Sequence, residues 1–171
     1  MELFCAPFES PIGTFWLLGN QKGLVSLKLS EDPVEMERFP GGRPRLNPSV
    51  LSRALEELRD YFRGQRRSFT VPLCPQGTPF QLRVWNFIRT IPWGETRSYK
   101  EVAEAIGCPR GARAVGLALK ANPLPIFIPC HRILRENGQI GGFSLGLERK
   151  RWLLEHEGVR VRWPGRIPRR G

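Results

Sequence analysis

Cys130 and His131 stand together near the end of the run NPLPIFIPCHRIL, residues 122–134. Three prolines alternate there with apolar residues, which predicts a stiff, extended and dry approach to the cysteine. Because a free thiol has a pKa of about 8.5, a nucleophilic cysteine needs a base or a positive environment. His131 is the nearest candidate base, acting directly or through a water molecule. The alternative for Cys130 is a buried structural thiol.

A catalytic histidine also needs an acid that orients its ring. The last predicted helix, LERKRWLLEHEG, offers two. Glu157 shares a helix face with Leu153, so it is predicted to point inward, whereas Glu155 is predicted to be solvated. Cys130, His131 and Glu157 thus form the candidate reactive set.

Cysteine and histidine usage argues against other kinds of site. The four cysteines are widely spaced without a CxxC motif, and they are Cys5, Cys74, Cys108 and Cys130. The only histidines are His131 and His156, and no compact Cys/His cluster exists. We therefore expect free thiols and no metal site.

The chain shows no apolar run that could span a bilayer, and its start, MELFCAPFES, does not have the pattern of a secretion signal. We therefore expect a soluble protein without a membrane partner. Its expected location is the cytoplasm, or the nucleus if the source is a eukaryote.

Positive charge is concentrated in the second half of the chain. The net charge is +11 over 171 residues, yet residues 1–75 hold 10 Lys+Arg against 9 Asp+Glu, and residues 76–171 hold 17 against 7. A basic half beside a neutral half favours a polyanionic partner, most often nucleic acid. The alternatives are a charge that serves solubility, or a genome that favours arginine codons.

The first half predicts a β-meander followed by a helix. GTFWLLGN and GLVSLKLS read as strands joined by the turn 20–23, and residues 31–47 read as a loop. Apolar residues recur at helical spacing from Pro48 until Gly64. SFTVPL, residues 68–73, is a possible further strand, and CPQGTP reads as a hinge between the two halves.

The second half is predicted to be mostly helical. Thr78 with Gln81, and Ser98 with Glu101, form two capping boxes that start helices, and Pro79 takes the first helical position of the earlier one. PRGARAVGLALKAN follows the second helix after a turn of three or four residues. The final helix is closed by Gly158, and the Arg-rich tail beyond it is predicted to be loosely ordered.

Two helices joined by so short a turn form a helix-turn-helix candidate. In the second helix Ala112, Val115 and Leu119 fall on one face. The cations Arg110, Arg113 and Lys120 fall near one another on another face, and Gly111, Ala114 and Gly116 are small enough for a close approach of DNA. The alternative is an amphipathic surface helix with solvated cations.

Four segments carry a resemblance to a known family: GTPFQLRVW, IPWGETRSYKEVA, ARAVGLALKANPLPIFIPCHRI and WLLEHEG. Over most of residues 77–158 the chain resembles the O6-alkylguanine-DNA alkyltransferases. The resemblance implies an α+β fold. Residues 1–75 would form a ribonuclease-like domain of β-meander plus helix, and residues 76–158 a mostly helical domain with a winged-type helix-turn-helix. Residues 159–171 are the Arg-rich tail.

The resemblance also implies a reaction. The family binds double-stranded DNA in the minor groove, flips the damaged guanine out of the stack, and transfers its O6-alkyl group to a cysteine. Because a thioether is not hydrolysed, each molecule would react once, without a cofactor. O4-alkylthymine would be a weaker substrate, and we expect the protein to act as a monomer.

Residue roles follow by match to the family motifs. Cys130 is the acceptor, His131 the base that acts through water, and Glu157 the acid that orients it. Asn122 braces the active-site turn, and Tyr99 is the donor that helps guanine leave.

The same match places the DNA contacts. Arg113 is the finger that fills the place of the flipped base, while Gly141 and Ser144 lie in the loop that forms one pocket wall. The remaining predicted DNA-binding residues lie on or beside the second helix, and they are Arg110, Lys120, Ala114 and Gly116.

The chain departs from the family at three points. Leu145 stands where many relatives carry glycine, so the pocket could be narrower. Phe143 replaces a tyrosine, which removes one hydroxyl contact. Some relatives carry zinc in the N-terminal domain, but this chain has Cys5 and no histidine there, so we expect none.

Three other functions remain as alternatives. A module that only recognises lesions is argued against by Cys130, which such relatives lack. A regulator with an incidental thiol would bind a specific sequence and form no adduct. A cysteine hydrolase would need an oxyanion hole, for which the sequence offers no candidate.

Overall fold

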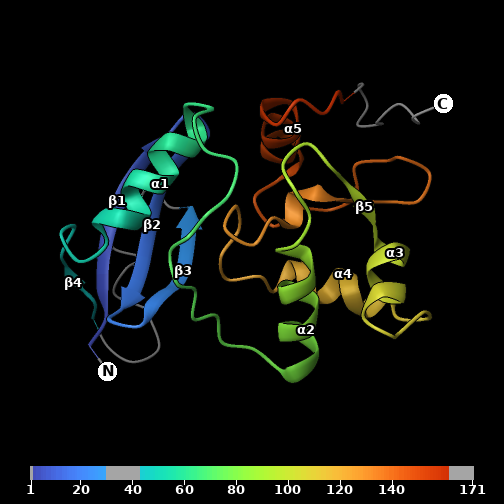
Figure 1. Cartoon of the computed structure of the whole chain (residues 1–171), viewed down its shortest axis with the longest axis horizontal. Helices are drawn as coiled ribbons and strands as arrows, with labels where there is room; N and C mark the ends of the chain where they lie inside the picture. The colour runs from blue at the N-terminus through green and yellow to red at the C-terminus, as the bar shows by residue number, and fades with distance from the viewer. Residues whose placement is uncertain (1, 30–42, 162–171) are drawn as a thin grey trace. The chain divides into compact units, whose positions relative to one another are not determined.

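The structure is a computed structural model that describes residues 2–29 and 43–161 (Figure 1). Its contacts divide the chain into two compact units, Met1–Gln76 and Gly77–Gly171. The first unit combines a sheet with one long helix, and the second is mostly helical. The predicted α+β class is confirmed. None of the described helices is long and apolar enough to cross a membrane.

The first unit is built on a meander. Strands β1 (Phe4–Ser10), β2 (Gly13–Asn20) and β3 (Gly23–Leu29) pair antiparallel in chain order, as predicted. The predicted turn between β2 and β3 is held by the Asn20 side chain, which accepts hydrogen bonds from the backbone N–H groups of residues 22 and 23.

The predicted loop over residues 31–47 contains a short strand. β4 (Arg45–Leu46) pairs parallel with β1, so the sheet order is β3-β2-β1-β4. A two-residue strand is too short to show the alternation that reveals strands in a sequence. Most of the remaining loop, residues 30–42, lies outside the described residues.

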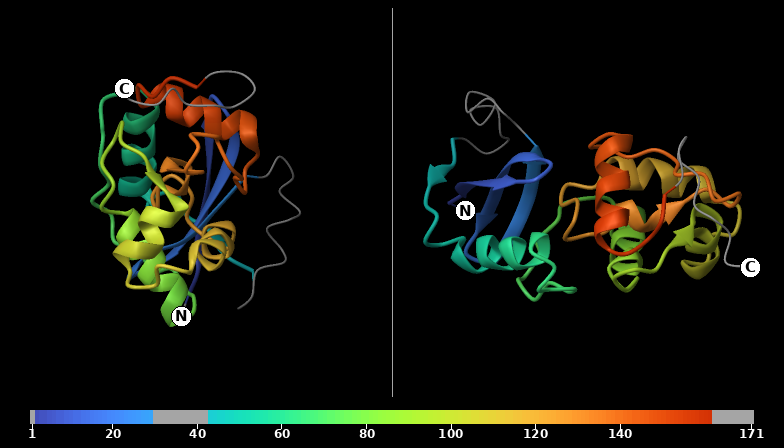
Figure 2. Two further views of the ribbon diagram at one scale, coloured as in Figure 1. Left: turned by 90° about the vertical axis from the view of Figure 1, so that its right-hand side faces the viewer. Right: turned by 90° about the horizontal axis from the view of Figure 1, so that it is seen from above.

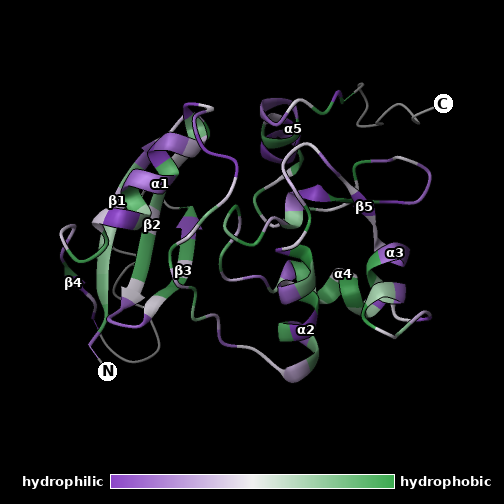
Figure 3. Cartoon of the chain, in the orientation of Figure 1, coloured by the Kyte–Doolittle hydropathy of each residue, from purple (hydrophilic) through white to green (hydrophobic). Residues whose placement is uncertain are grey.

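Helix α1 (Ser52–Phe62) lies across one face of this sheet (Figures 1 and 2). Its buried Leu58 and Tyr61 supply the helix side of the core, and Phe15 and Leu17 supply the strand side. Figure 3 shows the hydrophobic colouring on β2 and hydrophilic residues on much of α1. The helix was predicted to start at Pro48, but residues 48–51 form a turn.

The predicted strand over residues 68–73 is wrong. Only Leu73 makes an isolated bridge, to Leu24. The buried Glu57 carboxylate takes the preceding N–H groups instead, because it accepts hydrogen bonds from the backbone of Thr70 at 2.6 Å and of Val71 at 3.2 Å. Donors held by a carboxylate cannot join a strand ladder.

Both predicted capping boxes are confirmed in the second unit. Thr78 and Gln81 start α2 (Pro79–Ile88), and Ser98 and Glu101 start α3 (Tyr99–Ala105). Both helices pack against α4 (Ala112–Lys120). The buried Trp85 of α2 donates a hydrogen bond to the Ala118 carbonyl at 2.8 Å, which fixes α2 on α4.

The connection between α3 and α4 is longer than predicted. It comprises residues 106–111 rather than three or four residues. Gly107 adopts a left-handed φ of 80° and ends the first helix early. The Gly111 N–H then donates to the Cys108 carbonyl at 2.7 Å, so the turn closes before α4 begins.

A two-stranded parallel sheet joins the helices to the reactive segment. β5 (Arg97–Ser98) pairs with β6 (Ile133–Leu134), which follows the 3-10 helix η2 (Cys130–Arg132). The last helix is α5 (Leu147–His156), and it contacts η2.

The tail was predicted to be loosely ordered from residue 159 onward. The structure corrects this for its first residues, because Val161 is buried and Val159 packs on the same apolar cluster as Leu154. Two valines give the chain enough apolar surface to stay on the core. Residues 162–171 lie outside the described residues.

Candidate active site

The approach to Cys130 is fixed, but it is folded back rather than extended as predicted. Asn122 donates from its side chain to the Ile128 carbonyl at 2.9 Å and accepts from the Leu124 N–H at 2.9 Å. Ile126 takes a left-handed φ of 75°, which a β-branched residue adopts only when its surroundings impose it. Asn122 therefore sits where it braces the turn before the cysteine.

His131, the residue after the cysteine, is hydrogen bonded to Glu157. His131 Nε2 lies 2.7 Å from Glu157 Oε2, and both side chains are fully buried. Arg132 binds the same carboxylate through Nε at 2.7 Å and Nη2 at 3.0 Å, and donates from Nη1 to the Ile91 carbonyl at 2.6 Å. One buried carboxylate is thus shared by a ring and a guanidinium.

The protonation pattern follows from these contacts. Burial by itself would raise the pKa of Glu157, but His131 and Arg132 outweigh it and hold that pKa well below its ordinary value. A carboxylate only accepts, so the Nε2 atom of His131 carries the proton between them. His131 Nδ1 is then the basic nitrogen, and it is buried with no hydrogen-bond partner among the described residues.

The two neighbouring reactive groups are kept neutral by burial. Burial raises the pKa of the Cys130 thiol to about 11, although the Asn122 side chain and the Lys150 charge oppose that rise. Burial also lowers the pKa of His131, with Glu157 opposing it. At neutral pH the site therefore holds a thiol beside an unprotonated imidazole, which is the starting state for proton removal by a base.

Lys150 is a buried cation whose charge acts on Cys130, and it was not among the predicted site residues. Its Nζ donates to the carbonyls of Ile133 at 2.6 Å, Gly142 at 3.0 Å and Ile140. Burial lowers its pKa to about 8. The ammonium ties the strand after η2 to the loop that carries Gly142, and its charge favours the thiolate form of Cys130.

These elements enclose a pocket of about 410 Å³ that Cys130 lines. The other lining residues come from α3, α4 and the loop before α5, and they are Tyr99, Gly116, Leu119, Lys120, Gly142, Phe143 and Ser144. The volume lies within the range of about 300–1,000 Å³ that is usual for small-molecule sites.

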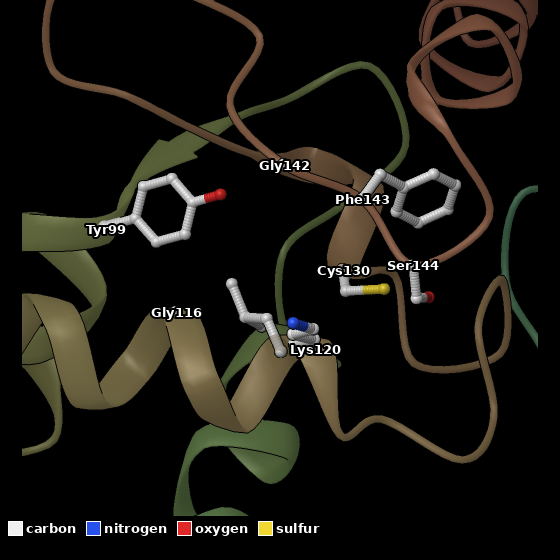
Figure 4. Close-up of a pocket in the computed structure, with 8 residues that line it drawn as sticks. Tyr99, Gly116, Lys120, Cys130, Gly142, Phe143 and Ser144 are labelled. Atoms are coloured by element: carbon white, nitrogen blue, oxygen red, sulfur yellow. The ribbon is translucent and has the colours of Figure 1, made fainter.

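Tyr99 forms the wall opposite the thiol. Figure 4 shows its hydroxyl directed toward Gly142, with Cys130, Phe143 and Ser144 on the other side of the pocket. Gly141 has a φ of 71°, and a Cβ atom there would lie 2.8 Å from the Tyr99 hydroxyl. Only glycine therefore allows the loop to approach the ring this closely.

Known protein families match both units of the chain. Residues 79–159 match the DNA-binding domain of 6-O-methylguanine DNA methyltransferase, and residues 3–75 match its ribonuclease-like domain. The chain belongs to the 6-O-methylguanine DNA methyltransferase family.

Individual members of this methyltransferase family are similar over nearly their full length. A methylated-DNA–protein-cysteine methyltransferase of Methanosarcina acetivorans is 42% identical over 91% of this chain and 99% of its own. The Mycobacterium tuberculosis protein of the same name is 45% identical over 90% and 91%.

Solved structures agree with this assignment. The Mycobacterium tuberculosis O6-methylguanine methyltransferase superposes with a TM-score of 0.82 at 40% identity, covering 94% of this chain and 96% of that one. The Mycobacterium tuberculosis OGT solved in complex with DNA gives 0.82 at 42% identity, covering 91% and 93%.

The residues predicted to contact DNA occupy the outer side of the methyltransferase helix α4 and its approach. Arg110, Arg113, Ala114 and Lys120 are exposed. Gly116 faces inward, and a Cβ atom there would lie 3.7 Å from the Tyr99 ring. Arg110 and Arg113 are thus displayed on the surface, whereas Gly116 and the exposed Lys120 also line the pocket.

Two of the three departures from the methyltransferase pattern, Phe143 and Leu145, fall differently in the structure. Phe143 lines the pocket, and its ring lies 6.5 Å from the His131 ring in an edge-on contact. Leu145 is not among the lining residues, and its carbonyl accepts a hydrogen bond from Arg149 at 3.2 Å. The predicted narrowing by Leu145 is therefore not found, because this residue does not line the pocket.

Sequence reasoning missed Arg132 and Lys150. Lys150 precedes Glu157 by seven residues and Leu154 by four, so helical spacing places it on the buried face of α5. A lysine on that face was a signal, since lysine is rarely buried without a role. The four cysteines are free, as predicted, and no group of three possible metal ligands is found in the described part of the chain.

Proposed function

We propose that this protein repairs DNA by taking the alkyl group from O6-alkylguanine onto Cys130 and keeping it there. The observation that carries the proposal is a thiol that lines an open pocket and is followed directly in the chain by His131. The Nε2 of that histidine is bound to Glu157, and its Nδ1 has no hydrogen-bond partner among the described residues. Family membership and a DNA-bound relative support DNA as the partner.

The chemistry requires one proton transfer and one substitution. The Cys130 proton passes to His131 Nδ1 through a bridging water, and Glu157 stabilises the imidazolium that forms. The sulfur then bonds to the alkyl carbon while the carbon–oxygen bond breaks. The electron pair stays on the guanine O6, and the base takes up a proton as it leaves.

The pocket walls have matching roles. Tyr99 supplies the hydrogen bond that stabilises the departing guanine. Lys150 holds the loop that carries Gly142 in place through its hydrogen bond to the Gly142 carbonyl. Asn122 keeps the thiol in place by bracing the turn before it. Because a thioether is not hydrolysed, each molecule reacts once.

Reaching the lesion requires that the base leave the duplex, since O6 is otherwise stacked inside it. Arg113, exposed on α4, would fill the gap, and Arg110, Lys120 and Ala114 would contact the groove. Gly141 and Ser144 would border the entering base. Weaker transfer from O4-alkylthymine, action as a monomer and a cytoplasmic or nuclear location stay predictions.

A pair of cysteine variants tests the proposal. Wild type, Cys130→Ser and the control Cys108→Ser are incubated with a duplex carrying one O6-methylguanine, and the DNA is then hydrolysed and its bases analysed. We expect lesion loss with wild type and Cys108→Ser only, while Cys130→Ser still binds the duplex. Lesion loss with Cys130→Ser would refute the assignment.

A further inference from the structure

A second cavity adjoins the reactive pocket on the other side of Tyr99. It is an open groove of about 470 Å³, and Tyr99 lines both cavities. The groove also receives Lys100 from the start of α3, Arg110 from the turn before α4, and Arg135 with Glu136 from the turn after β6. Nothing in the proposed transfer chemistry uses these charged groups.

The β5–β6 pairing explains why Arg135 and Tyr99 lie together. The strands are parallel, and Ser98 pairs with Leu134. Tyr99 directly follows β5 and Arg135 directly follows β6. Adjacent strands run about 5 Å apart, so these two residues start close together. The backbone thus sets a guanidinium beside the pocket's tyrosine.

The turn that carries Arg135 is well defined. The Arg135 N–H donates to the Gln139 carbonyl at 2.9 Å, and the Gly138 N–H donates to the Arg135 carbonyl at 2.9 Å. The Asn137 side chain accepts from the Gln139 N–H at 3.0 Å. The position of the Arg135 backbone therefore does not depend on a ligand.

The charges in the groove are not balanced. Lys100 lies 3.7 Å from Glu136, and this exposed pair is weak. Among the described residues, Arg110 and Arg135 form no ion pair with a carboxylate. Two guanidinium groups beside an open groove fit an anion with several oxygens, and a phosphodiester is such an anion.

The neighbouring pocket identifies the source of that phosphodiester. A nucleotide whose base enters the thiol pocket must leave its sugar and both flanking phosphates outside it. Phosphate contacts set the position of a protein on DNA. A groove that shares Tyr99 with the pocket is therefore well placed to receive one of them.

We infer that Arg135, with Arg110, binds one of the two phosphates that flank the flipped nucleotide, and so holds the extruded strand beside Tyr99. This inference rests on the proposed function. It assigns Arg135 a positioning role in the reaction on DNA and none in the chemistry at Cys130.

The inference is tested by removing one positive charge from the protein and one negative charge from the DNA. The proteins are wild type, Arg135→Gln, Arg110→Gln, and the matched control Arg89→Gln, which removes an exposed arginine of the same unit that lines neither cavity. The duplexes carry O6-methylguanine with ordinary linkages, or with one uncharged methylphosphonate on its 3′ or its 5′ side.

On ordinary DNA we expect Arg135→Gln to slow transfer about tenfold at limiting protein, as for the loss of one charged hydrogen bond. The salt dependence of binding should weaken by about one phosphate contact. A methylphosphonate on the contacted side should slow wild type by a similar factor and Arg135→Gln no further. Arg89→Gln should respond like wild type.

Other results would overturn the inference. One is an unchanged rate for Arg135→Gln on ordinary DNA; another is equal slowing by Arg135→Gln on all three duplexes. Equal slowing with the free base O6-benzylguanine would also overturn it, because the residue would then support the pocket itself. Failure of the proposed function is visible separately, since wild type would then react with neither DNA nor free base.

Discussion

His131 Nε2 lies 2.7 Å from Glu157 Oε2, although 25 residues separate them and both side chains are fully buried. The contact joins η2 to the end of α5, so the reactive segment and the last helix are held by one carboxylate. Arg132 binds the same carboxylate through two nitrogens. The His131–Glu157 pair should therefore affect both the stability of the fold and the rate of alkyl transfer, and these two effects can be measured separately.

Glu157→Gln is expected to cost about 3 kcal/mol of unfolding free energy, since it leaves the buried Arg132 guanidinium without its anion. The matched control is Glu155→Gln, an exposed carboxylate on the same helix, which should change stability by less than about 1 kcal/mol. Urea unfolding at neutral pH provides both values. Equal losses for the two variants would contradict the structural role of Glu157.

The unfolding free energy of wild type should also fall at acidic pH through the protonation of Glu157, and Glu157→Gln should lack this dependence. The pKa of Glu157 is lower in the folded state than its ordinary value of 4.5, so the unfolded chain binds this proton first. Its contribution is present above pH 4.5 and is lost as pH falls toward the folded value. Unfolding curves across acidic pH should therefore converge for wild type and variant.

The rate of alkyl transfer should fall at both ends of the pH range. Below the lowered pKa of His131 the imidazole is protonated and cannot accept the thiol proton. Above about 8 the Lys150 ammonium loses its proton, and with it the charge that favours the thiolate. Single-turnover rates on O6-benzylguanine measure the profile without DNA binding.

Replacing Lys150 tests whether its charge shapes the dependence of the transfer rate on pH. Lys150→Met should slow transfer throughout and remove the decline above pH 8, whereas Arg151→Met, an exposed neighbour, should leave the profile unchanged. A Lys150→Met profile identical to wild type would show that Lys150 has no electrostatic role.

Tyr99→Phe removes the hydroxyl that faces Gly142 but keeps the ring in the pocket wall (Figure 4). Loss of one hydrogen-bond donor to the leaving group should slow transfer by about 10²-fold, with little change in lesion binding. The reduction should be similar on duplex DNA and on free base. A weaker affinity with an unchanged rate constant would instead make Tyr99 a binding residue.

Arg113→Ala should slow transfer on duplex DNA more than on the free base, because only the duplex has a gap to fill. Arg113 is exposed on α4 and lines neither cavity, so the pocket should stay intact. The comparison needs rates at saturating protein on both substrates. Equal slowing on the two would exclude a role in base extrusion.

Local signals in the sequence predicted much of the fold. The capping boxes at Thr78 and Ser98 were correct because a cap is decided by residues within one helical turn. The strand over residues 68–73 failed because Glu57, more than ten residues away, takes its backbone donors. A contact of that kind leaves no periodic trace in the strand itself.

The site was predictable only in part for the same reason. Glu157 was expected inward from its helix face, and the structure brings it to His131. Lys150 and Arg135 were missed because their surroundings are set by backbone carbonyls and by strand pairing between distant segments. The folded-back turn before Cys130 likewise depends on Asn122 hydrogen bonds that residue types alone do not specify.

The most direct test is to locate and count the transferred methyl group. Wild-type protein is incubated with an excess of duplex carrying O6-methylguanine, and intact mass and peptide mapping follow. We predict one methyl group per molecule, on Cys130, with lesion loss stopping at one per protein. A methyl group on another residue, or continued repair by protein whose Cys130 stays unmodified, would contradict the account.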